Sequence, residues 1–118
     1  MSITVLTPAA VAAKEAITKF VLLDAVLTNQ TSGIVHLPKG RKWFKCSVAG
    51  TGAVSGTVTW YGNDSESTTD GVLLATSTLS GTTTDSTGAD IPAEPEYVYC
   101  TLASISGTNA AVTASVSV

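Results

Sequence analysis

Residues 43–61, WFKCSVAGTGAVSGTVTWY, alternate apolar and polar side chains on both sides of a segment that contains two glycines. Such alternation with a period of two is typical of β-strands that are buried on one face. The Ala49–Ala53 segment between the two halves predicts a short hairpin loop. We therefore expect two strands whose inner faces are formed by Phe44, Cys46 and Val48 and by Val54, Gly56, Val58 and Trp60.

The same period continues on both sides of this stretch and predicts further strands. A final hairpin is expected to turn at Gly107-Thr108-Asn109, and Pro92 and Pro95 exclude a central strand at 91–95. Roughly seven or eight short strands with frequent turn signals indicate an all-β fold, either an antiparallel β-sandwich or a jelly-roll-like barrel. The expected strands are 20–27, with Val21, Leu23, Ala25 and Leu27 on its buried face, 34–37, 72–79, a weak strand near 82–86, 97–105 and 110–118.

A chain of 118 residues that is 44% hydrophobic is long enough for one domain with its own core. The start of the chain differs from the rest, because Thr7 is a suitable N-cap, Pro8 suits a first helical position and alanines follow. We expect residues 1–19 to form a short N-terminal arm or helix and residues 20–118 to form the β-sandwich domain.

Charge is divided unevenly along the chain. All six Lys and Arg residues precede Cys46 and are accompanied there by only Glu15 and Asp24, which gives residues 1–45 a net charge of about +4. Residues 46–118 carry seven carboxylates and no Lys or Arg, which gives about −7. This polarity suits contacts between unlike ends of neighbouring molecules, and the overall charge of −3 argues against a general nucleic-acid binder.

The expected cellular compartment is inferred from two features that the sequence lacks. The apolar runs near residues 20–27 are far shorter than the roughly 20 residues needed to span a bilayer, and the N-terminus has no basic region followed by an apolar one. We therefore expect synthesis in a cytosol and no membrane partner. In that compartment Cys46 and Cys100 are expected to be buried free thiols, with a disulfide as the less favoured alternative.

The residues required for catalysis are scarce. His36 is the one imidazole, it lies in an alternating segment typical of a half-buried strand, and no nucleophile motif surrounds it. Asp64, Glu66 and Asp70 offer oxygen ligands of the kind that Ca²⁺ prefers, but their spacing matches no EF-hand, so a solvated loop is favoured. The sequence predicts no enzyme, no catalytic residue, no metal and no cofactor.

A basic cluster, Lys39, Arg41, Lys42 and Lys45, surrounds Trp43. Four positive charges are too few for strong binding to phosphates, so an acidic protein surface is the expected partner and nucleic acid is not. Aromatic residues on outward faces offer two alternatives, because they suit either stacking on sugars or anchoring a protein interface. The aromatic residues concerned are Trp43, Tyr61, Tyr97 and Tyr99.

Three segments follow one another between residues 58 and 110: VTWYGND at 58–64, VLLATSTLSGT at 72–82 and YVYCTLASISGTNA at 97–110. Together they resemble small β-sandwich virion proteins of tailed bacteriophages, and the similarity covers about residues 42–118. In that group an aromatic strand and an Asn-Asp loop are followed by a Leu-x-Gly-Thr turn and a final aromatic strand. The sequence departs from this pattern at Tyr99 and Cys100, where an Arg is often found.

The resemblance implies a head decoration or cement protein, or a small tail protein. We therefore expect a non-enzymatic virion structural protein on the capsid surface whose partners are the major capsid protein and copies of itself, as a dimer or trimer. The alternative is a tail- or fibre-associated adhesion or carbohydrate-binding module that uses Tyr61, Tyr97 and Trp43. The residues expected to contact the capsid are Ile3, Val5, Leu6 and Val11 of the arm, and Lys39, Arg41, Lys42 and Trp43 of the basic turn.

Overall fold

The computed structural model describes residues 19–118 except 39 and 94, and it shows an all-β fold in which all pairs are antiparallel. The predicted arm or helix lies outside the described residues, apart from Lys19. The strands are β1 (Lys19–Val26), β2 (Gln30–Thr31), β3 (Val35–His36), β4 (Gly40–Asn63), β5 (Val72–Gly81), β6 (Thr84–Ala93) and β7 (Tyr97–Ser117).

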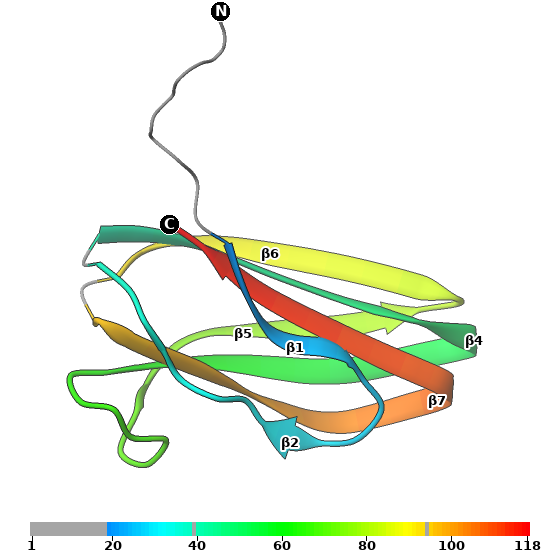
Figure 1. Ribbon diagram of the computed structural model, residues 1–118. Helices are drawn as coiled ribbons and strands as arrows, with labels where there is room; N and C mark the ends of the chain where they lie inside the picture. The colour runs from blue at the N-terminus through cyan, green and yellow to red at the C-terminus, as the bar shows by residue number, and fades with distance from the viewer. Residues whose placement is uncertain (1–18, 39, 94) are drawn as a thin grey trace, which may run out of the picture.

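Two long strands, β4 and β7, organise the sheet. They pair with each other along most of their length, from Trp43↔Ser117 to Asn63↔Tyr97. The first half of β4 also pairs with β6, and its second half pairs with β5. The last half of β7 pairs with β1, and its first half pairs with β2 and β3. One open seven-stranded sheet thus folds over into two layers, as Figure 1 shows. The sandwich prediction is confirmed, and the sheet is not closed into a barrel.

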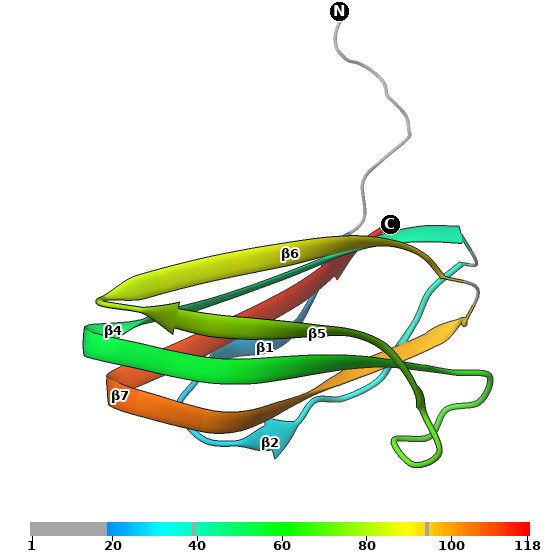
Figure 2. The same ribbon diagram turned by 180° about the vertical axis from the view of Figure 1, so that it is seen from behind.

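The predicted hairpins at Ala49–Ala53 and at Gly107–Asn109 are wrong in an informative way. The chain does reverse direction at both places, as Figures 1 and 2 show, but each segment is a bend within one long strand. The halves on either side of a bend lie in opposite layers, and both pair with the other long strand. The two bends are themselves neighbours, because Thr51 pairs with Thr108. The sequence pattern predicts that the chain reverses direction here. It does not show whether the two halves pair within one layer or stack on each other from opposite layers.

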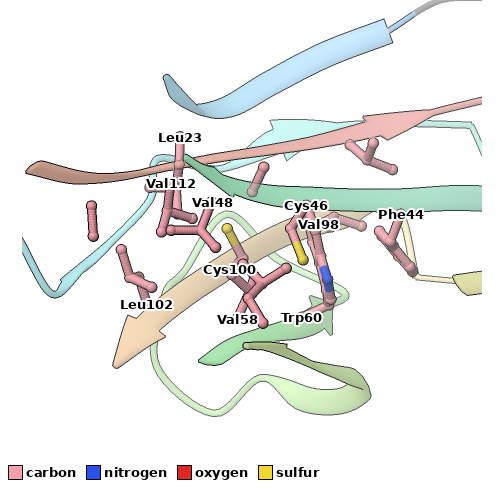
Figure 3. Close-up of a cluster of buried hydrophobic side chains, with 14 of the residues drawn as sticks. Leu23, Phe44, Cys46, Val48, Val58, Trp60, Val98, Cys100, Leu102 and Val112 are labelled. Carbon is pink, nitrogen blue, oxygen red and sulfur yellow. The ribbon is translucent and has the colours of Figure 1, made fainter. Parts of the chain in front are cut away.

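The core lies between the two layers and is formed by the predicted inner faces (Figure 3). Phe44 from the first half of β4 stacks on Trp60 from the second half, with ring centroids 4.7 Å apart. The face predicted for the last strand is correct from Ala110 to Val116, with Val118 half-buried. The buried apolar residues are Leu23, Leu37, Phe44, Cys46, Val48, Val54, Val58, Trp60, Leu79, Val98, Tyr99, Cys100, Leu102, Ala110, Val112, Ala114 and Val116.

The face predicted for the first strand is correct at Leu23 and wrong at Val21, Ala25 and Leu27. Val21 and Leu27 are exposed, whereas Phe20, Leu22 and Val26 pack against the core with Leu23. The register of β1 with β7 shifts twice, between Val21 and Leu23 and again between Leu23 and Val26. Each shift inserts a residue that moves the following side chains to the other face, so strict alternation fails here.

The weak strand predicted near 82–86 is a full strand, β6, that continues to Ala93. It pairs with β4 alone among the described strands, so Pro92 lies in an edge strand. This position is consistent with the prediction that prolines exclude a central strand, because an edge strand need not donate every N–H.

The free-thiol prediction is confirmed, since Cys46 and Cys100 are buried and unpaired. Figure 3 shows both sulfur atoms within the core cluster. Burial raises the pKa of the Cys46 thiol, and it raises the pKa of Cys100 to about 12. Ser32 lies beside Cys100, where its Oγ accepts the Cys100 N–H at 2.9 Å. The thiols are therefore protonated in the folded protein at neutral pH.

The folded protein is expected to lose stability at alkaline pH through Cys100. Because the unfolded thiol ionises near 9 and the folded thiol near 12, this contribution is fully present below pH 9 and declines above it, by up to about 1.4 kcal/mol per pH unit. Urea unfolding between pH 8 and pH 10.5 tests this with wild type and Cys100→Ala, which share the other titrating groups. The stability difference between them should shrink as pH rises, and a constant difference would contradict the prediction.

Candidate protein-binding face around Trp43

The outer surface of the layer formed by β1, β6 and the adjoining halves of β4 and β7 carries most of the described basic residues. The strand register aligns paired residues of neighbouring strands in two adjacent rows across this surface. One row contains Lys19, Ser117, Trp43 and Asp90, and the next contains Val21, Ser115, Lys45 and Gly88. We define the Trp43 face as Lys19, Val21, Arg41, Trp43, Lys45 and Asp90, all of which are exposed.

Trp43 lies in the middle of this face with 46% of its surface exposed. Its ring lies over Gly88 of β6, because a Cβ added at Gly88 would stand 2.6 Å from Trp43 Cζ2. Any larger residue at position 88 would displace the indole. The glycine thus lets a large apolar ring lie against the sheet while its other side remains accessible. Tryptophan in such a setting is typical of interface anchors.

Arg41 is held beside Trp43 by Asp90. Its Nη2 donates to Asp90 Oδ2 at 2.9 Å, and its Nε donates to both carboxylate oxygens at 3.2 and 3.3 Å. The hydrogen bond and charge of Asp90 raise the pKa of Arg41 above its ordinary value. Both side chains are about half exposed or more, so the pair contributes little to folding stability. Its main effect is to fix the orientation of the guanidinium on this face.

A hollow of about 380 Å³ opens next to the ring. Its lining is mainly hydrocarbon, although three of the lining residues, Arg41, Lys42 and Asp90, are charged. A mainly apolar hollow next to charged side chains suits an apolar side chain of a protein partner. The lining residues are Arg41, Lys42, Trp43, Asp90, Ser117 and Val118.

Lys42 corrects the sequence prediction. It was expected to contact a partner, but it is 1% exposed, on the same inward face of β4 as Phe44. Its Nζ donates to the carbonyl oxygens of Pro38 at 3.1 Å and Gly40 at 3.2 Å. A buried ammonium needs such acceptors, and here they come from Pro38, which precedes β4, and from Gly40, its first residue. Lys42 therefore fixes the start of the strand and does not form part of the exposed face.

The other predicted contact residues divide into two groups. Arg41 and Trp43 lie together on the face, as described. Lys39 and the arm residues Ile3, Val5, Leu6 and Val11 lie outside the described residues. The described chain begins at Lys19, which pairs with Ser117, and Ser117 in turn pairs with Trp43. Residues 1–18 are therefore covalently attached at the border of the Trp43 face.

The aromatic residues do not form one common platform. Trp43 lies on the outer face of one layer, whereas Tyr61 and Tyr97 belong to the halves of β4 and β7 in the other layer. Tyr61 stacks on Tyr99 at 5.1 Å, and Tyr97 stacks on His36 at 4.6 Å. Tyr99 is 4% exposed, so its predicted outward exposure is wrong.

Gly71, at the end of the loop of residues 64–71, packs closely against Tyr99, because a Cβ at Gly71 would clash with the Tyr99 hydroxyl. The conformation of this loop is organised by Asn63, whose Nδ2 donates to the carbonyl oxygens of Ser67 at 3.2 Å and Thr69 at 3.0 Å. Among the described residues, no group of three His, Cys, Asp or Glu side chains is arranged to hold a metal ion. Asp64, Glu66 and Asp70 are exposed, as expected of a solvated loop.

His36 differs from its predicted half-buried state. Its side chain is exposed, and its Nε2 lies 3.3 Å from Glu96 Oε1 while its ring stacks on Tyr97. Neighbouring strands bring the three residues together, since His36 pairs with Tyr97.

Three residues beside Trp43 were not identified from the sequence: Gly88, Asp90 and Val118. Gly88 and Asp90 lie between the weak strand predicted near 82–86 and the segment 91–95, where no element was predicted, and Val118 was expected to face inward at the end of the last strand. Only the pairing of β4 with β6 and β7 brings them to Trp43. The alternation that places Lys42 in line with Phe44 and Cys46 is visible in the sequence, and it was the available signal for the burial of Lys42.

Comparison with known proteins adds no family assignment. A scan against protein-family models and a search of curated proteins find no match to this sequence. No helix that is long and apolar enough to cross a membrane occurs within residues 19–118, positions 39 and 94 aside.

Proposed function

We propose that this protein is a non-enzymatic structural protein of a bacteriophage virion that binds the assembled capsid and stabilises it through the Trp43 face. The observation that carries the proposal is the exposed indole of Trp43, which lies over Gly88 and beside an apolar hollow, with Arg41, Lys45 and Lys19 around it. Exposed Trp and Arg around an apolar centre are the residues that dominate binding energy at protein interfaces.

The charge of the face supports an acidic or mixed protein surface as the partner. Three cations and one carboxylate occupy the face, whereas the rest of the described chain is strongly acidic. Because these charges are exposed, their attraction is screened by salt. The resemblance of residues 42–118 to small phage virion proteins supports the major capsid protein as this partner. Binding only the assembled shell stabilises that shell by mass action.

The arrangement of the aromatic residues favours this function over carbohydrate binding. A sugar platform formed by Trp43, Tyr61 and Tyr97 would need these rings on one surface, and the strand register separates Trp43 from the other two. Tyr61 and Tyr97 are each already stacked on another ring.

Binding to shells of the phage that encodes the chain, purified without it, tests the proposal. Wild type should co-elute with shells at a fixed copy ratio in size-exclusion chromatography with light scattering, and it should dissociate as salt rises. Replacing Trp43 with Ala together with Lys45→Gln should weaken binding by about tenfold or more.

A matched variant tests whether shell binding depends on the Trp43 face or on the charge of the protein in general. Asp64→Asn with Glu66→Gln changes two exposed charges in the loop of the other layer and should leave binding unchanged. Wild-type protein that fails to bind shells at low salt, or equal binding by the Trp43 variant, would overturn the proposal.

A further inference from the structure

The open sheet has several edges, and within residues 19–118 all but one of these edges carry features that oppose pairing with another chain. Strand β6 contains Asp85, Asp90 and Pro92, and β1 contains Lys19, Asp24 and two register shifts. Strands β2 and β3 are two residues long. Charges, proline, bulges and shortness are the devices by which natural proteins block edge-to-edge association.

Strand β5 has none of these residues. Its ten residues, VLLATSTLSG, contain no charge and no proline. Among the described residues it pairs with β4 alone, and it diverges from β6 beyond the turn at residues 82–83 (Figure 2). It also begins with two of the three most exposed large apolar residues of the described chain, Val72 at 67% and Leu73 at 58%. This combination marks β5 as an edge available for pairing.

The direction of the free backbone groups follows from one hydrogen bond. The Ser80 N–H donates to Asp85 Oδ2, on the side away from β4. The register of β5 with β4 is unbroken from Thr76 to Ser80, so the N–H groups of Thr76 and Thr78 point to the same side as that of Ser80. Asp85 thus accepts the outward N–H of Ser80 at the end of β5 next to the turn. The outward backbone groups around Thr76 remain available for pairing with another strand.

We propose that β5 pairs antiparallel with β5 of a second copy, centred near Thr76, and that the chain is thereby a two-fold dimer. A partner for this edge must offer an uncharged strand with free donors and acceptors, and a second β5 offers both. Identical strands related by a two-fold axis are necessarily complementary in this way.

The charges of the two copies are compatible with pairing between their β5 strands. In the proposed register the two acidic loops, which carry Asp64, Glu66 and Asp70, lie at opposite ends of the paired segment, about 40 Å apart for twelve residues of strand. That separation exceeds the Debye length at physiological salt several times. The dimer is therefore insensitive to salt, in contrast to capsid binding through the Trp43 face.

The test compares three variants by sedimentation velocity over a range of protein concentrations. Wild type should shift from 12.0 kDa towards twice that mass as concentration rises. Thr76→Lys places two like charges opposite each other across the axis and should raise the dissociation constant at least about tenfold. Thr76→Pro removes an outward donor without removing a bond to β4 and should have the same effect.

Thr31→Lys is the matched control. Thr31, Thr101, Thr59 and Thr76 form one row across the layer, and Thr31 is exposed at the opposite end of that row. This variant should dimerise as wild type does. Circular dichroism verifies folding, and Thr76→Lys keeps the test valid if the proline variant does not fold. Hydrogen exchange of residues 72–81 should slow as wild-type concentration rises.

A monomeric wild type at all concentrations, an unaffected Thr76→Lys dimer, or equal loss with Thr31→Lys would overturn the inference. The outcome is independent of the proposed function. Protein that dimerises but does not bind shells would overturn only the function, and monomeric protein that binds shells would overturn only the dimer.

Discussion

Replacement of Trp60 by alanine is expected to lower the free energy of unfolding by about 3–5 kcal/mol. Trp60 is fully buried, and its ring stacks on Phe44 from the opposite layer, so its removal leaves a cavity between the two layers. A domain of this size is generally stable by only about 5–15 kcal/mol. The variant should therefore unfold at a much lower denaturant concentration, as urea titration followed by circular dichroism would measure.

Two controls test whether the loss of stability in Trp60→Ala comes from the burial of this side chain. Trp43→Ala removes the same side chain from an exposed site and should cost far less than Trp60→Ala. Trp60→Phe keeps an aromatic ring against Phe44 and removes an indole N–H that has no hydrogen-bond partner among the described residues, so it should cost about 1 kcal/mol. Equal losses for Trp60→Ala and Trp43→Ala would contradict the role of Trp60 in joining the layers.

Replacement of Gly107 by alanine is expected to be the other large effect, with a loss of about 3 kcal/mol or more. Gly107 has a φ of +117°, which side chains rarely adopt. A Cβ there would also lie 2.7 Å from the Ala53 carbonyl oxygen and 2.9 Å from Val54 Cγ1, so the two neighbouring bends would be forced apart. Thermal unfolding measured by calorimetry would detect the loss.

Alanine substitutions at two other glycines distinguish the stability lost through backbone strain from the stability lost through crowding. Gly52 also has a positive φ, of +74°, but a Cβ there meets nothing within 4 Å. Gly52→Ala should therefore cost only about 1–2 kcal/mol from strain. Gly33 has neither a positive φ nor a close neighbour, so Gly33→Ala should change stability little. If Gly107→Ala costs no more than Gly52→Ala, the contact between the bends does not matter for stability.

Much of the fold was predictable, because the strands from Trp43 to Trp60 and from Val98 to Val116 alternate with a period of two. The predictions failed where a long-range pairing overrides that local pattern. In β1, two register shifts against β7 exchange the faces of Val21 and its neighbours. At the bends, glycines permit a reversal, and only the pairing of β4 with β7 determines that the halves stack.

The candidate site was predictable only in part, for a related reason. Trp43 and Arg41 could be identified because they are close in sequence and have suitable side chains. Their neighbours Gly88 and Asp90 could not, since the contact depends on the register of β4 with β6. Lys42 was assigned by its charge rather than by its place in the alternation, and the backbone carbonyls of Pro38 and Gly40 that make its burial possible are not evident from residue type.

The continuity of β7 through both layers has a consequence for how the protein is made. Strands β1, β2, β3 and β4 all pair with β7, which is the last of the described strands to leave the ribosome. Neither layer is complete before β7 arrives, so folding depends on contacts between distant parts of the chain, which form slowly. During synthesis β1 therefore lacks the strand with which it pairs, and the inner faces of β4 lack the part of the core that β7 supplies. The apolar side chains concerned are exposed to aggregation or to chaperones until translation of β7 is finished.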